Sequence, residues 1–288
     1  FLILGSASPN LKRQSAESLA GRIIYHELSP FLLNEIEESE NNFLSLLLKG
    51  GYPLSFLSED NNKSFMWREA FISTYLERDI PQLGIRIPSL QLRRFFTMLA
   101  HYQAQLLNVS KIAASMGVSS PTINHYIDIL SETFIVRYLQ PYHKNLKKRL
   151  VKKPKIFIRD SGIVFCLLKV LNFEDMFSHP SLGDIFEGFV LEQVINLIPH
   201  SWEIYFYRTS AGTEIDVVLF PQGKGPIGIE VKFSSSPQTS RGFWEAFNDL
   251  QCEKGYIVYI GKEIYPIKEN VYALPIYSLP QILLGNFE

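Results

Sequence analysis

Residues 213–233 read TEIDVVLFPQGKGPIGIEVKF, and this stretch decides the fold expected for the C-terminal third of the chain. Alternation of apolar and polar residues predicts two strands, at 214–220 and 227–233. The segment between them is rich in proline and glycine, which favours a tight turn. The pattern therefore predicts a β-hairpin folded about Gly223.

The charged residues of this hairpin are expected to gather on one face of a sheet. Period-two alternation predicts that Ile215 and Val217 share one face while Asp216 lies on the other, and it places Glu230 and Lys232 together on the second strand. A hairpin folded in this way would set Asp216 directly opposite Glu230. Opposed carboxylates repel, so the pair favours a bound cation or compensation by Lys232.

Magnesium is the cation that these residue types suggest, because it binds through one or two carboxylates together with waters and phosphate oxygens. Asp216 and Glu230 are the candidate metal ligands, and a metal-bound water would be the nucleophile. Lys232 could orient that water or neutralise charge in the transition state. Glu187 is a further candidate, because it shares a helix face with apolar residues; alternatively, its stem packs there while its head reaches water.

The elements around the hairpin predict a mixed sheet flanked by helices over residues 156–288. Helix, hairpin, charged face and second helix follow one another in an order that resembles the PD-(D/E)XK nuclease superfamily. That resemblance implies a restriction-endonuclease-like α/β domain, with Asp216, Glu230 and Lys232 as its motif and Glu187 as the acid on its first helix. The alternative is a nuclease-like fold that serves only for binding.

Residues 89–155 predict a winged helix-turn-helix, because three short helical segments precede two strands separated by a basic segment. Ser119 or Ser120 could cap the third helix. Thr122, Asn124 and His125 would then point outward from its first turns, where short polar side chains suit base edges or phosphates. The basic segment would contact a DNA backbone; its cationic residues are His143, Lys144, Lys147, Lys148, Arg149, Lys152, Lys153 and Lys155. Alternatives are a solvated loop and a surface for protein contacts.

Composition sets limits on the class of protein. A chain of 288 residues should form two or three domains, and a net charge of −1 gives no overall attraction to nucleic acid or acidic membranes. The two cysteines provide neither a zinc site nor a disulfide framework, which is typical of a reducing cytosol. No apolar run is long enough to span a bilayer, so we expect a cytoplasmic protein without membrane contact.

Nearly the whole chain resembles a bacterial and archaeal family of AAA-type ATPases with an uncharacterised C-terminal domain. The resemblance rests on LGS, SAESLAGR, LKGGYP, WREAFISTYLERDI, KIAASMGVS, IRDSG, FEGFVLEQ, TEIDVV and IEVK. It implies a remnant of the ATPase core at residues 1–45 and a helical lid at 46–88. We expect a strand at IIYHEL and an acidic helix around NEIEESE within this region.

The same resemblance implies that Ser6 is a sensor residue and that Arg22 lies near a γ-phosphate, acting on a neighbouring subunit of a homo-oligomer. Alternatively, Arg22 is a solvated helix cap. The sequence contains no G-x-x-x-x-G-K-[ST] motif. We therefore expect ATP to bind only in an intact protein with a further part upstream of Phe1.

Overall fold

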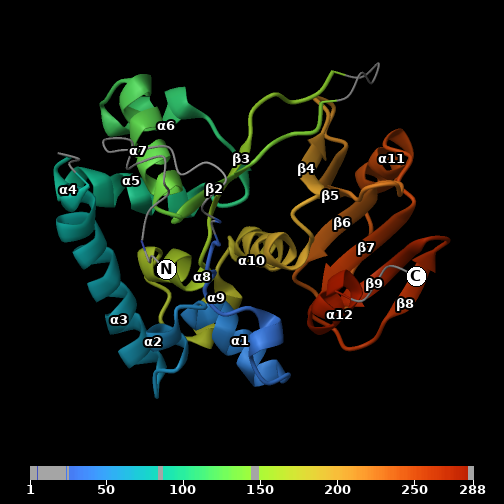
Figure 1. Ribbon diagram of the computed structural model, residues 1–288, viewed down its shortest axis with the longest axis horizontal. Coiled ribbons are helices and arrows are strands. Elements are labelled where there is room, and N and C mark those ends of the chain that lie inside the picture. The colour runs from blue at the N-terminus through green and yellow to red at the C-terminus, as the bar shows by residue number, and fades with distance from the viewer. Residues whose placement is uncertain (1–4, 6–23, 25, 84–86, 144–148, 285–288) are drawn as a thin grey trace.

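The computed structural model describes residues 5, 24, 26–83, 87–143 and 149–284. Helices gather on one side of the molecule and a six-stranded sheet lies on the other, with α10 (Leu182–Leu197) between them (Figure 1). The fold is thus a mixed α/β arrangement with two sheets, as the sequence predicts. Among the described residues, no helix combines the length and apolar character needed to cross a membrane.

The helical side begins with α1, which Ser39 caps by accepting a hydrogen bond from the backbone N–H of Asn42. Its helices bury apolar faces in one large core that also includes α10 and one face of the six-stranded sheet. The elements are η2 (Leu33–Glu35), α1 (Glu40–Lys49), α2 (Pro53–Phe56), α3 (Asn61–Thr74), the π-helical turn η3 (Tyr75–Asp79), α4 (Ile80–Gln82), α5 (Ser89–His101), α8 (Ser161–Leu167) and α9 (Phe173–Ser178).

The expectations for residues 23–40 were wrong where the structure describes them. Residues 24 and 26–29 form no regular element, and the predicted acidic helix is replaced by a single 3-10 turn, Leu33–Glu35, before α1 begins. The acidic side chains of this segment serve other contacts. Glu27, for example, forms ion pairs with two arginines that lie far away in the sequence.

A three-stranded antiparallel sheet connects the two sides of the molecule. Its strand order is β1-β3-β2, and two helices separate β1 from β2 along the chain. Ser119 caps α7, as predicted, because its hydroxyl accepts from the N–H of Thr122. The elements are β1 (Gln105–Leu106), α6 (Val109–Met116), α7 (Ser120–Glu132), β2 (Val136–Leu139) and β3 (Lys155–Ile158).

The two arms between β2 and β3 lie along β4 (Glu203–Arg208) at the edge of the six-stranded sheet (Figure 1). The N–H of Tyr142 donates to the carbonyl of Phe206 at 2.8 Å, and the N–H of Val151 donates to that of Arg208 at 3.0 Å. The ring of Tyr142 also stacks on Phe220, with 4.5 Å between centroids. The arms therefore join the three-stranded sheet to the larger one.

The six-stranded sheet has the order β4-β5-β6-β7-β9-β8. Strands β4, β5 and β6 are antiparallel, β6, β7 and β9 are parallel, and β8 closes the far edge. Helices α10 and α12 cover one face, and α11 packs on the other. The remaining elements are β5 (Glu214–Phe220), β6 (Ile227–Lys232), α11 (Arg241–Asp249), β7 (Lys254–Tyr259), β8 (Tyr265–Lys268), β9 (Val271–Pro275), η4 (Ile276–Ser278) and α12 (Leu279–Leu284).

The boundary expected between residues 155 and 156 falls inside β3. Strand β3 pairs with β1 and β2, and the two helices that follow it contact the helical side of the molecule. The elements of the six-stranded sheet begin only with α10, at Leu182.

Candidate functional site

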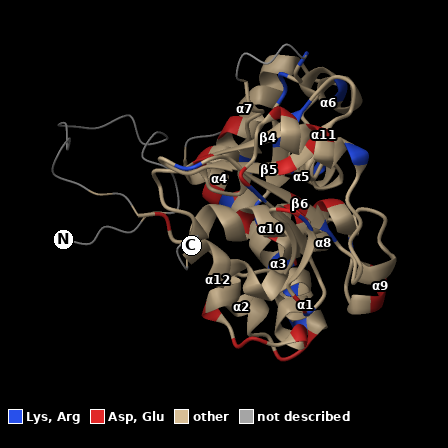
Figure 2. Cartoon of the chain, turned by 90° about the vertical axis from the view of Figure 1, so that its right-hand side faces the viewer, with Lys and Arg blue, Asp and Glu red and all other residues tan. Residues whose placement is uncertain are grey.

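Charged residues from both sides of the molecule line a cavity of about 600 Å³. Figure 2 shows acidic and basic segments close together around α10, β5 and β6. Five carboxylates and three cations give the lining a formal charge of −2. These residues are Asp184 and Glu187 on α10, Glu214 and Asp216 on β5, Glu230 and Lys232 on β6, Arg208 at the end of β4, and Lys155 on β3.

The β5–β6 hairpin brings Asp216 and Glu230 to opposing positions, as predicted. Val217 pairs with Ile229, so Asp216 and Glu230 are the next residues in that register. The strands are paired only as far as Val217, and the carboxylate Oδ2 of Asp216 accepts from the backbone N–H of Val231 at 2.9 Å. Asp216 thereby holds the two strands together at the edge of the cavity.

A β-bulge corrects the predicted alternation in β5. Tyr205 pairs with Val218 and Tyr207 with Ile215, so Asp216 and Val217 together face one residue of β4. Ile215 consequently packs in the cluster on the α11 side, whereas Val217 packs in the cluster on the α10 side. The extra residue breaks period two at the position of the aspartate, and bulges often re-aim a side chain in this way.

Lys232 pairs with the carboxylate of Glu230, the Nζ to Oε1 distance being 2.8 Å. The Glu230 side chain is buried, and burial together with the nearby charge of Asp216 raises its pKa to about 8 despite the opposing effect of Lys232. Burial alone would lower the pKa of Lys232, but its carboxylate neighbours, Glu230 first, raise it. Lys232 therefore carries its charge into the cavity at physiological pH.

Lys155 is buried inside the carboxylate cluster, so its assignment to a DNA-contacting basic segment was wrong. Its side chain is 3% exposed, and its Nζ lies 2.8 Å from Glu187 Oε1, 2.8 Å from Glu214 Oε1 and 3.7 Å from Asp216 Oδ1. It is one of the lining residues that sequence reasoning missed. The available signal was its place beside the apolar run Ile156–Ile158, where a lysine would be buried and would need partners.

The acids of α10 lie at the cavity wall. Glu187 pairs with Lys155; burial and the charge of Asp216 raise its pKa well above the ordinary range, against the effect of that lysine. Asp184, one turn earlier, also has a raised pKa because of burial, partly offset by a hydrogen bond with Gln105 of β1. The carboxylate of Glu187 is thus paired with Lys155 at the cavity wall and does not reach out into open water.

In the described part of the chain, no three His, Cys, Asp or Glu side chains are grouped so that they could hold a metal ion. The oxygens of Glu187 and Glu230 are instead engaged by two lysines. The donor atoms of Asp216 and Glu230 are nevertheless carboxylate oxygens, the ligand type through which Mg²⁺ binds proteins by one or two carboxylates together with waters. The residues therefore fit Mg²⁺ in the chemistry of their donor atoms.

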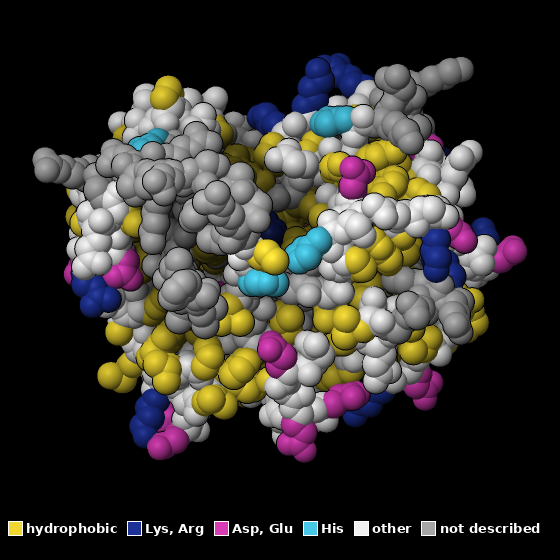
Figure 3. Space-filling model, viewed as in Figure 1, with side chains coloured by type: hydrophobic (Ala, Val, Ile, Leu, Met, Phe, Trp, Pro, Cys, Tyr) yellow, Lys and Arg dark blue, Asp and Glu magenta, His cyan; other side chains and the backbone are white. Residues whose placement is uncertain are grey.

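A second cavity, of about 440 Å³, lies between α7 and the arm that leads into β3. Asn124 lines it from α7, Ser110 from the start of α6, and Lys152 and Lys153 from the arm. Figure 3 shows Lys and Arg side chains gathered at the top of the molecule.

The predicted DNA-contacting residues differ in their surroundings. Asn124 and His125 are exposed, whereas Thr122 is half-buried and its hydroxyl lies 2.8 Å from that of Ser119. Arg149 is exposed, and its carbonyl accepts from Ser210. The other predicted residues lie outside the described part of the chain; these are Lys144, Lys147 and Lys148, and the predicted nucleotide-sensing residues Ser6 and Arg22.

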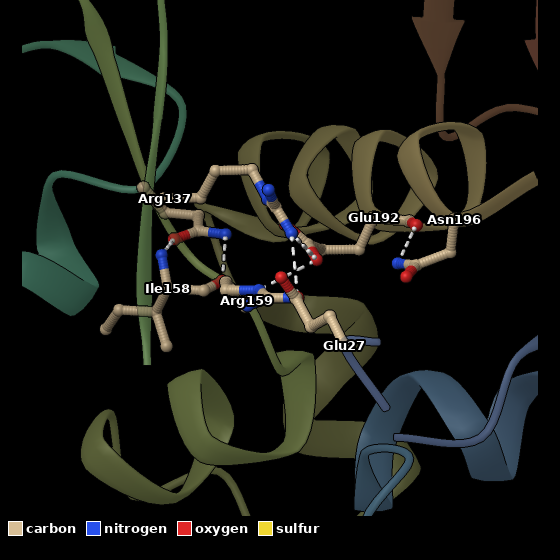
Figure 4. Close-up of polar contacts among 7 residues, drawn as sticks. Glu27, Arg137, Ile158, Arg159, Glu192 and Asn196 are labelled. Carbon is tan, nitrogen blue, oxygen red and sulfur yellow. Dashed lines mark hydrogen bonds and ion pairs between the residues drawn. The ribbon is translucent and has the colours of Figure 1, made fainter. Parts of the chain in front are cut away.

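A buried ion-pair cluster holds β3 against α10 at the end away from the cavity (Figure 4). The carboxylate of Glu192 on α10 binds Arg137 Nε at 2.5 Å and Arg159 Nε at 3.0 Å. Glu27 approaches the same two arginines from the N-terminal segment. Lys155 and Arg159 therefore anchor the two ends of β3 to Glu187 and Glu192 of one helix.

Two family models match this chain. Residues 40–174 match the model described as Domain of unknown function (DUF8612), and residues 182–279 match Domain of unknown function (DUF4143). The second domain often occurs at the C-terminus of AAA-ATPase-like proteins. Its match begins where α10 begins, and includes Glu187, Asp216, Glu230 and Lys232 but not Lys155.

Similar proteins occur in bacteria and archaea. Uncharacterised proteins of Mycobacterium bovis and Mycobacterium tuberculosis are each 41% identical to this chain over 275 residues, which cover 96% of it and 62% of the relative. One of Methanocaldococcus jannaschii is 21% identical over 88% of this chain and 60% of its own length. The crystal structure of protein VC1899 from Vibrio cholerae matches with a TM-score of 0.23 and 13% identity, over 77% of this chain and 54% of that one. The chain spans about 62% of the length of its mycobacterial relatives.

Proposed function

We propose that this chain is the DNA-processing part of a larger AAA-type ATPase-family protein, and that its carboxylate cavity is a Mg²⁺-dependent nuclease centre. One observation carries the proposal. Asp216, Glu230, Lys232 and Glu187 come from two strands and a helix, and they line one cavity of about 600 Å³. ATP binding is assigned to a part of the larger protein outside this chain.

The order of elements supports a nuclease-type fold. Helix α10, the antiparallel strands β4 to β6, helix α11 and the parallel strand β7 follow one another, with the helices on opposite faces of the sheet. The sequence of helix, hairpin and second helix supports the PD-(D/E)XK resemblance. The location of Asp216 on β5, and of Glu230 and Lys232 on β6, supports their assignment to its motif.

These four residues would have different roles in the reaction. Asp216 and Glu230 would hold the cation, which supplies an activated water for attack on a phosphodiester. Lys232 carries a positive charge beside Glu230 and can orient that water or stabilise charge that develops on the phosphate oxygens. Glu187 contributes a further carboxylate to the cavity from α10.

The three-stranded sheet offers a route by which DNA could reach this centre. Its order of helix, strand, two helices and two strands is that of a winged helix, with Asn124 and His125 exposed on the third helix. Leu106 and Lys155, which pair between β1 and β3, line the carboxylate cavity, and their chain neighbours Leu107 and Pro154 line the second cavity. A strand held by the exposed Lys152 and Lys153 would therefore come near the carboxylates.

A second candidate function is binding or assembly without catalysis. The observation that favours it is the pairing of the carboxylates with Lys155 and Lys232, which neutralises part of the cluster without a metal. In that case the same fold would dock on DNA or on a protein partner.

Metal-dependent cleavage of single-stranded, duplex and branched DNA separates the two functions. We expect cleavage by the wild-type chain with Mg²⁺ or Mn²⁺ that is lost in Asp216→Asn and in Glu230→Gln. Glu269→Gln is the matched control, because Glu269 is exposed and distant from the cavity lining. Absence of cleavage on every substrate, together with absence of metal binding, would refute the nuclease proposal and leave the binding function.

A further inference from the structure

The carboxylate cavity is closed by a residue from outside the C-terminal domain. Lys155 belongs to β3 of the three-stranded sheet, whereas Glu187, Glu214 and Asp216 belong to α10 and β5. The side chain is almost fully enclosed, and its ammonium contacts all three of these carboxylates. The site is therefore assembled from two parts of the chain, and one part supplies a cation.

The position of this ammonium matters for any other cation. Glu187 is engaged by Lys155 at 2.8 Å, and Asp216, a proposed metal ligand, lies 3.7 Å from the same nitrogen. Two positive charges so close together repel, and the repulsion is strong where one of them is buried, as Lys155 is. A divalent cation and the Lys155 ammonium therefore compete for the same oxygens.

Lys155 has an alternative partner to which its ammonium could move. Glu214 holds the ammonium at 2.8 Å, and its side chain is 25% exposed, compared with 13% for Glu187 and Asp216. Glu214 further binds Arg208 at 3.2 Å, on the more open side of the cavity. A rotation of the flexible lysine chain toward Glu214 would free Glu187 and Asp216 while keeping one ion pair intact.

We propose that Lys155 is the resting counter-ion of this site, and that it withdraws from Glu187 and Asp216 toward Glu214 when a divalent cation binds. The inference rests on the proposed metal-dependent function and adds its regulation. The three-stranded sheet then controls metal access, since any movement of β3 moves Lys155. Glu192 and Arg159 at the other end of β3 fix that strand to α10, so the resting state is held at both ends.

Mn²⁺ binding to the full chain tests the competition, measured by electron paramagnetic resonance at pH 7.5. We expect one Mn²⁺ per wild-type chain and binding about tenfold or more tighter in Lys155→Met, since a charged competitor is removed. Lys155→Arg keeps the charge and should bind no tighter than wild type. Addition of Asp216→Asn to Lys155→Met should abolish the increase in Mn²⁺ affinity.

The outcomes separate this inference from the function on which it rests. Equal Mn²⁺ affinity in wild type and Lys155→Met would overturn the competition and leave the nuclease proposal standing. Absence of Mn²⁺ binding in both proteins would overturn both.

A second measurement is made on the wild-type protein itself, and a substitution serves only to assign the signal. In wild-type protein with ¹⁵N-labelled lysine ammonium groups, the buried Lys155 ammonium should give a slowly exchanging signal, assigned by its absence from Lys155→Arg. We expect Mg²⁺ to shift or broaden this signal in proportion to its binding. An unchanged signal at saturating Mg²⁺ would overturn the proposal.

Discussion

At the scale of single residues, the cavity holds carboxylates in surroundings that disfavour their charge. Burial and Asp216 raise the pKa of Glu230 to about 8, although Lys232 lies 2.8 Å away. A carboxylate with a raised pKa favours the folded state when it is protonated and opposes it when it is ionised. When no cation is bound, the free energy of unfolding should therefore depend on pH.

We predict that, in the presence of a chelator, the free energy of unfolding falls as pH rises from about 4.5 toward 8. The stability contributed by Glu230 is fully present below its ordinary pKa of 4.5 and is lost as pH passes through the raised value. Glu230→Gln should make this fall smaller, and the part that remains comes from the other carboxyl groups with raised pKa values, which include Glu187, Asp184 and Asp160. Urea unfolding across this pH range measures the effect. The same pH dependence in wild type and Glu230→Gln would contradict the assignment.

At the scale of secondary structure, β3 and α10 depend on each other. Lys155 begins the strand and Arg159 directly follows it, and the two form ion pairs with Glu187 and Glu192 of the helix. This pairing could not be predicted from sequence, because a contact between charged residues far apart in the chain leaves no periodic trace. The hairpin could be predicted, since alternation and Gly223, which has a φ of +72°, specify it locally. The bulge at Asp216 could not, because it arises from pairing with β4.

Glu192→Gln should destabilise the chain by about 3 kcal/mol, because it leaves two partly buried arginines with one carboxylate fewer. Glu269→Gln, at an exposed position, should change stability by less than about 0.5 kcal/mol. Denaturant unfolding of the two variants provides the comparison. A loss for Glu192→Gln no larger than that of the control would show that the cluster contributes nothing to the packing of β3 on α10.

At the scale of the whole molecule, one core joins the helical side to the six-stranded sheet, and both cavities adjoin the β1–β3 pair. The sequence predicts most of the elements but not this junction, and the domain boundary expected at residue 156 divides β3. Strand β3 was predicted from its apolar run. Its partners depend on tertiary contacts that a single sequence does not show.

Because both cavities adjoin the β1–β3 pair, we predict that DNA passes the second cavity on its way to the carboxylates. Replacement of Lys152 and Lys153 by glutamine should weaken DNA binding, and should lower the salt slope by about 2 if each lysine contacts one phosphate. Lys63→Gln with Lys262→Gln removes two exposed lysines elsewhere and should leave the slope unchanged. Binding isotherms at several salt concentrations measure both. An equal slope in the two double variants would exclude this path.

The central claim is that the carboxylate cavity cleaves phosphodiesters with a divalent cation. Its most direct test is the rate of DNA cleavage by wild type and Lys232→Met at saturating Mn²⁺, with Mn²⁺ binding measured on the same samples. Lys232 is assigned to stabilising the transition state, whereas Asp216 and Glu230 are assigned to binding the cation. We therefore predict that Lys232→Met still binds Mn²⁺ but that its cleavage rate is at least about 100-fold lower than that of wild type. Cleavage by Lys232→Met at the wild-type rate, or a wild-type chain that binds Mn²⁺ and cleaves no DNA, would contradict the account.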